Sequence, residues 1–139
     1  MMKEEAKEFM KNYATFVDGV TSTASKDTDA FVDRVKELQE QGVDVSRLLT
    51  ASEGLSAEAG EFTEIPKKIL FQGKPYDEDN VFHMKRELGD IMWYWMQACI
   101  ALNLDPVDVI EENVRKLEAR WEGGSFDVFL SENRKEGDL

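Results

Sequence analysis

Two short acidic motifs have a spacing that could hold a metal ion. The first is EAGE, from Glu58 to Glu61, and the second is ELGD, from Glu87 to Asp90. Residues three or four apart lie on one face of a helix, so each motif would present a pair of carboxylates. Carboxylate oxygens are the ligands that hard cations such as Mg²⁺ prefer. The two motifs therefore predict a divalent-cation site, provided that their helices pack side by side.

The apolar residues around the motifs indicate that the carboxylates point inward. Glu58 falls inside the apolar stripe of a helix expected over residues 46–69, and Glu61 lies beside it. On the next helix, Glu87 and Asp90 share a face with Tyr94, while nearly every other direction is apolar. A helix that is apolar on almost all sides is expected to be buried on almost all sides. Four carboxylates that meet in a poorly solvated site are either partly protonated or neutralised by cations.

Two other interpretations of the acidic residues stay open at this point. The chain has 29 Asp and Glu among 139 residues, so a Glu-x-x-Glu spacing arises easily by chance on a solvated surface. An acidic helical protein could also be a non-enzymatic interaction protein, for example a DNA mimic. A mimic needs its carboxylates outward, whereas both motifs here coincide with apolar stripes.

A third group of polar residues could bind phosphate. Asn113, Lys116 and Arg120 lie close together on one side of a helix expected over residues 106–121. Lys and Arg one turn apart are a plausible clamp for phosphate oxygens. Alternatively, they are solvated basic residues that pair with neighbouring acids.

Composition excludes several classes of protein. The net charge of -12 argues against binding to nucleic acid, whose phosphates attract basic surfaces. No apolar run is long enough to cross a membrane, and the first residues carry no apolar signal region. The single cysteine, Cys99, and the single histidine, His83, exclude an intrachain disulfide and a multi-histidine metal site. We expect a cytoplasmic protein with one domain over residues 1–139.

Apolar periodicity predicts an all-α fold, a compact bundle of about five helices. The active face is expected between two antiparallel helices, and a helix-bundle interface between subunits is expected to cover the remaining apolar surface. Pro66 is expected to kink or break its helix. Residues 21–29 are expected to form a polar connector, and residues 131–139 a flexible tail. The predicted helices cover about residues 3–18, a segment marked by Phe31, Val35 and Leu38, and about residues 46–69, 80–102 and 106–121.

Together these motifs resemble a known family. EAGE followed by ELGD, with 25 residues between them, is similar to the signature of the MazG-like all-alpha nucleotide pyrophosphohydrolases. The segment ENVRKLEARWEGGSFD resembles the part of the family that follows this signature, and YATFVDGVTS resembles its first helix. The resemblance covers most of residues 9–127.

The resemblance implies an activity and a set of site residues. Members of the family hydrolyse a (deoxy)nucleoside triphosphate to the monophosphate and pyrophosphate with Mg²⁺, for which Mn²⁺ could substitute. They assemble as homodimers or homotetramers. Base preference stays open, and a dUTPase-like or phosphoribosyl-ATP pyrophosphatase-like activity is an alternative. Carried over to this chain, the metal ligands and catalytic residues are Glu58, Glu61, Glu87 and Asp90, and the substrate-binding residues are Tyr94, Asn113, Lys116 and Arg120.

Overall fold

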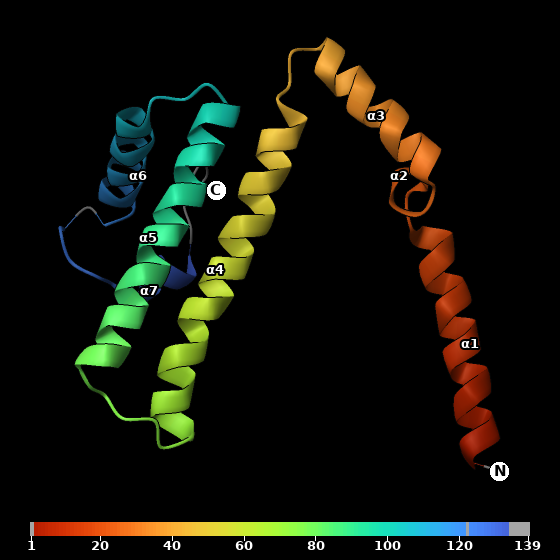
Figure 1. The fold of residues 1–139 in the computed structure, drawn as a ribbon, viewed down its shortest axis with the longest axis horizontal. Coiled ribbons are helices and arrows are strands. Elements are labelled where there is room, and N and C mark those ends of the chain that lie inside the picture. The colour runs from red at the N-terminus through yellow and green to blue at the C-terminus, as the bar shows by residue number, and fades with distance from the viewer. Residues whose placement is uncertain (1, 122, 134–139) are drawn as a thin grey trace. The chain divides into compact units, whose positions relative to one another are not determined.

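The computed structural model describes residues 2–121 and 123–133, and these ranges contain helices and no strands (Figure 1). The prediction of an all-α fold is confirmed. The chain divides into two compact units, residues 1–45 and residues 46–139. Each unit is described by itself below. A single domain over the whole chain stays a prediction.

The first unit holds three helices: α1 (Met2–Val20), α2 (Thr23–Lys26) and α3 (Thr28–Glu40). The side chain of Asp27 accepts a hydrogen bond from the backbone N–H of Ala30 at 2.8 Å and so caps α3. The prediction that residues 21–29 form only a polar connector is wrong, because α2 lies within them. A helix of four residues is too short to show an apolar period.

The second unit is built from α4 (Val45–Phe71), α5 (Glu78–Ala101), α6 (Pro106–Arg120) and α7 (Val128–Glu132). All five helices predicted from the periodicity are present among the described residues, and the short helices α2 and α7 add to them. The predicted tail is helical at its first two residues, which end α7, and residues 134–139 lie outside the described part of the chain.

Helices α4 and α5 form an antiparallel hairpin joined by the loop of residues 72–77 (Figure 1). Three contacts fix their register. The Arg47 guanidinium donates a hydrogen bond to Gln97 at 2.7 Å, the ring of Tyr94 lies against Gly54, and Glu58 hydrogen-bonds Glu87. The predicted antiparallel pairing of the two motif-bearing helices is therefore confirmed.

Helix α4 passes through Pro66 without a break, so of the two predicted effects of this proline the break is wrong and the kink stays a prediction. Proline removes one helical hydrogen bond and crowds the preceding turn. Pro66 is half-buried and follows the buried Ile65, whereas Lys67 and Lys68 after it are exposed. Packing in the folded protein stabilises most helices, and the burial of Ile65 supplies such packing beside the proline.

Side-chain caps fix where α5 and α6 begin. The carboxylate of Asp77 accepts a hydrogen bond from the backbone N–H of Asn80 at 2.9 Å. Asp105 does the same for Val107 at 2.8 Å, with a proline at the first helical position. These caps confirm the predicted start of α6.

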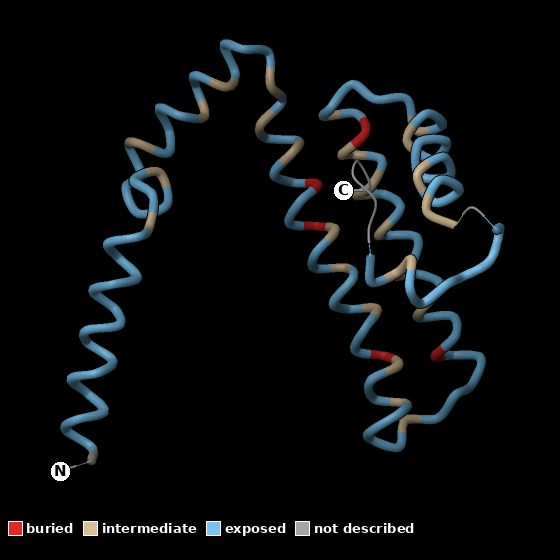
Figure 2. The backbone as a smooth tube through the Cα atoms, turned by 180° about the vertical axis from the view of Figure 1, so that it is seen from behind, coloured by how far each residue is buried: buried red, intermediate tan, exposed pale blue. Residues whose placement is uncertain are grey.

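Few residues are buried in the described structure (Figure 2), and many of its large apolar residues are exposed. On the single chain α5 is exposed on one side, so the predicted burial on nearly all sides depends on the predicted subunit interface and stays a prediction. The surface that we call the outer face of α5 is exposed, because a helical hairpin covers only one stripe of each helix. The outer face consists of Phe82, Met92, Trp93, Met96 and Ile100.

Within the described residues, no helix combines the length and the apolar character needed to cross a membrane.

Candidate metal centre

Three carboxylates from the two motifs meet on the α4–α5 hairpin. Glu58, Glu61 and Glu87 each offer an oxygen, and these oxygens all lie within 4.8 Å of one another. Glu58 and Glu87 are half-buried, whereas Glu61 is exposed. Such a set of oxygens from two helices is suited to a hard divalent cation.

The helical repeat explains why two of these acids meet inside the seam between the helices. On α4, Glu58 lies seven residues after the buried Ala51 and seven before the buried Ile65. On α5, Glu87 lies seven residues after the buried Asn80 and seven before Tyr94. Residues seven apart return to the same side of a helix in close packing. Glu58 and Glu87 therefore occupy positions that an apolar residue would ordinarily fill.

The surroundings of Glu58 disfavour its charge. Burial raises the pKa of Glu58 above its ordinary value of 4.5, and the negative charges of Glu61, Asp90 and Glu87 raise it further. The hydrogen bond with Glu87 acts in the same direction. A bound cation would remove this repulsion and favour the charged form. The donor set and its electrostatics thus fit a divalent metal ion.

Asp90 belongs to the same neighbourhood, although it lies at its edge. Its side chain is exposed, yet its charge acts on Glu58. The prediction that both acids of each motif point inward is therefore wrong in one respect. In each motif one acid lies in the seam and the other lies on the solvent side of it.

Tyr94 packs against α4 one helical turn from the carboxylates. A Cβ atom added to Gly54 would come within 2.1 Å of the Tyr94 ring, so only glycine leaves room for the ring. The ring of Trp93 meets that of Tyr94 edge to face, with 4.8 Å between the ring centroids. Sequence reasoning identified Tyr94 and missed Gly54. The available signal was a glycine in mid-helix one turn before Glu58.

Sequence reasoning also missed the Arg47–Gln97 hydrogen bond, which joins α4 to α5 beyond Tyr94. Gln97 interrupts the apolar run of α5 and lies on the same side of the helix as Asp90. That interruption was visible in the sequence. Its partner was not, because Arg47 is 50 residues away.

The three polar residues of α6 are less closely tied to the metal centre. Asn113 is exposed, and Lys116 and Arg120 are half-buried. The Arg120 guanidinium lies 5.5 Å from the centre of the Trp121 ring, a cation–π contact. Binding of phosphate by these residues stays a prediction.

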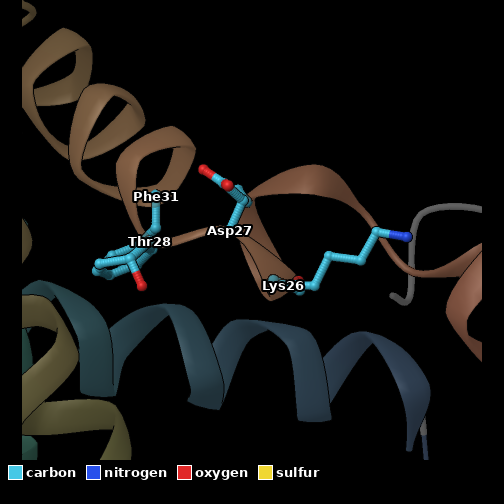
Figure 3. A pocket seen from close by; sticks show the side chains of 6 residues that line it. Lys26, Asp27, Thr28 and Phe31 are labelled. Carbon is cyan, nitrogen blue, oxygen red and sulfur yellow. The ribbon is translucent and has the colours of Figure 1, made fainter.

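A hollow of about 310 Å³ in the first unit is lined by residues of α2 and α3 (Figure 3). Its charged groups serve local structure. Lys26 binds the backbone carbonyl and the carboxylate of Asp18 at 2.8 and 3.1 Å, and Asp27 caps α3. We assign no chemistry to this hollow.

Comparison with known proteins points to the second unit. The family model described as the MazG nucleotide pyrophosphohydrolase domain matches residues 47–124. The chain is also similar to the Gene 37 protein of Mycobacterium phage L5, with 36% identity over 72 residues. That match covers 51% of this chain and 63% of the phage protein. No solved structure matches the chain.

Proposed function

This chain belongs to the MazG nucleotide pyrophosphohydrolase family, and from that membership we propose that it hydrolyses a (deoxy)nucleoside triphosphate to the monophosphate and pyrophosphate. The observation that carries the proposal is that carboxylate oxygens of Glu58, Glu61 and Glu87, all within the matched segment, lie within 4.8 Å of one another. A half-buried acidic cluster weakens a helical seam. Binding of a metal ion would explain why this acidic cluster is present.

We propose that Glu58, Glu61, Glu87 and Asp90 hold Mg²⁺, with Mn²⁺ able to take its place. When bound, such an ion supplies Lewis-acid polarisation of phosphoryl oxygens and offsets the negative charge of the substrate. The mutual repulsion that raises the pKa of Glu58 supports this assignment, because a cation at the same place would relieve it.

The side chains around the ion would bind and orient the substrate. A carboxylate that is not fully engaged with metal would accept a proton from the attacking water, while the bond between the α- and β-phosphates breaks. Lys116 and Arg120 would stabilise the charge on the departing pyrophosphate, with Asn113 beside them. Tyr94, next to the carboxylates, would contact the nucleoside. Such an enzyme would act on the nucleotide pool of the cytoplasm.

The test is pyrophosphate release from a panel of NTPs and dNTPs, including dUTP, with phosphoribosyl-ATP as a separate substrate. Each reaction is run with Mg²⁺, with Mn²⁺ and with EDTA. We expect equimolar monophosphate and pyrophosphate, with release abolished by EDTA. A folded protein that releases no pyrophosphate from any substrate would contradict the proposal and favour a binding protein.

We also propose that the enzyme is a homodimer or homotetramer. The support is the outer face of α5, whose five apolar side chains are exposed on the single chain. Exposed apolar side chains gathered on one side of a helix mark interaction sites.

A further inference from the structure

The Arg47–Gln97 hydrogen bond fixes which way the Gln97 amide points. A guanidinium group has only donors, so the amide atom that meets Arg47 must be the oxygen. The structure shows this arrangement, with 2.7 Å between the guanidinium nitrogen and Oε1 of Gln97. The amide nitrogen, which carries two N–H donors, therefore does not face Arg47. The hydrogen bond to Arg47 thus fixes which amide atom of Gln97 accepts and leaves its N–H donors to other groups.

Gln97 lies in line with the proposed metal centre. It follows Asp90 by seven residues on α5, which is about 10 Å along the helix and within about 20° around it. Tyr94 lies between the two, with its ring held against Gly54. This order of carboxylates, aromatic ring and amide donor matches the order of phosphates, sugar and base in a nucleotide. The separation is also about the reach from the phosphates to the far edge of the base.

Resting on the function proposed above, we infer that Gln97, oriented by Arg47, donates hydrogen bonds to the base and selects keto bases over amino bases. The favoured substrates are nucleotides of uracil, thymine and guanine, whose exocyclic oxygen accepts from the Gln97 amide. Cytosine and adenine carry an exocyclic amino group at the corresponding position, where a donor would meet a donor. A site built to hydrogen-bond one group rejects the analogue that lacks it, because polar groups are left unpaired.

The first test compares dUTP with dCTP and dITP with dATP, because within each pair an amino group replaces the exocyclic oxygen and no other exocyclic group changes. We expect kcat/KM to be at least about tenfold higher for the keto member of each pair. Calorimetry with non-hydrolysable α,β-imido analogues of dUTP and dCTP measures the same preference without turnover, and we expect Kd to differ in the same direction.

The second test changes Gln97 to Glu, which keeps the shape of the side chain and replaces donors with acceptors. We expect the dUTP to dCTP ratio in kcat/KM to fall at least about tenfold, with helix content unchanged by circular dichroism. Gln97→Ala, which removes the amide without adding charge, is expected to bring the ratio toward one. Gln72→Glu is the matched control, since Gln72 is an exposed residue of the hairpin loop and carries the same charge change.

Several outcomes would overturn the inference. Equal use of dUTP and dCTP by the wild-type protein, or a preference for dCTP, contradicts it while the hydrolase function stands. A Gln97→Glu variant that loses activity equally on both substrates indicates a structural role for Gln97. If no nucleotide is hydrolysed, the proposed function fails, and equal binding of the two imido analogues then removes the base selection as well.

Discussion

At the scale of single residues, a variant of Glu61 tests whether the acidic cluster is a metal site or a group of ordinary surface acids. Its carboxylate reaches the cluster although the side chain is exposed. We expect Glu61→Gln to lower kcat/KM for pyrophosphate release at least ~100-fold, because an amide is a weaker ligand than a carboxylate. The helix content should not change. Activity is measured by pyrophosphate release and helix content by circular dichroism.

The matched control is Glu64→Gln, one turn further along α4. Glu64 is exposed and pairs with Lys67 and Lys68. We expect this variant to keep full activity, since an exposed pair of this kind contributes little. An active, Mg²⁺-dependent Glu61→Gln enzyme would show that Glu61 has no part in the site.

The raised pKa of Glu58 predicts the direction in which stability and metal binding change with pH. Its folded-state pKa lies above the ordinary value of 4.5, so the metal-free folded protein binds the proton more tightly than the unfolded chain does. The contribution of Glu58 to the free energy of unfolding is greatest below pH 4.5, and it is lost as the pH rises through the folded-state pKa. Over the same range metal binding strengthens, because the ligand must be deprotonated.

We therefore expect the increase in Tm caused by Mg²⁺ to be small near pH 4.5 and to grow as the pH rises above the folded-state pKa of Glu58. Thermal melts in Mg²⁺ and in EDTA across this range measure the effect. Glu58→Gln removes both the titrating group and a proposed ligand, so Mg²⁺ should raise Tm little at any pH in this variant. An increase in Tm that is the same at every pH would contradict a site that includes Glu58.

At the scale of helices, the packing of α4 against α5 includes a close approach of the Tyr94 ring to Gly54. The Tyr94 ring occupies the space that a side chain at Gly54 would need. We expect Gly54→Ala to lower the free energy of unfolding by ~1–3 kcal/mol, as overpacking of a well-packed contact does. Denaturant unfolding measures the change.

Gly60→Ala is the control on the same helix. No atom lies within 4 Å of a Cβ at Gly60, so alanine should stabilise the helix by ~0.5–1 kcal/mol. The two variants make the same chemical change and should differ in sign. If both stabilise the protein, the contact between Gly54 and Tyr94 is not rigid.

The helices themselves could be predicted from the sequence, and their contacts only in part. Apolar residues at helical spacing located the five long helices, and two Glu-x-x-acid motifs identified the carboxylates that meet. The four residues of α2 carry no such period. The continuity of α4 at Pro66 was not predicted, because local propensity disfavours a proline inside a helix.

Contacts between helices depend on register, which the spacing within one helix does not fix. Arg47 and Gln97 are 50 residues apart in the sequence, and the register of α4 against α5 brings them into contact. The same register decides that Glu58 faces Glu87. It also leaves Glu61 and Asp90 on the solvent side of the seam, although the sequence predicted that both side chains point inward.

At the scale of the whole molecule, we expect the outer face of α5 to form the proposed interface between copies of the chain. Its five apolar side chains are exposed on the single chain, and Met92 alone is 56% exposed. A symmetric dimer through this face would contain Met92 twice, once from each copy. We expect Met92→Glu to dissociate the oligomer, because each buried carboxylate would lack a partner.

Sedimentation equilibrium measures the result against the chain mass of 15.9 kDa. We expect twice or four times this mass for the wild-type protein, and for Met92→Glu a fall to the monomer mass if the wild type is a dimer or at least to half the wild-type mass if it is a tetramer. Gln72→Glu adds the same charge at an exposed position of the hairpin loop, and it should keep the wild-type mass. A wild-type protein that sediments as a monomer would contradict the proposed assembly and would require another partner for the outer face. Since Met92 lies on the opposite side of α5 from Glu87, a monomeric Met92→Glu variant should still bind Mg²⁺, which separates the role of the outer face from that of the metal centre.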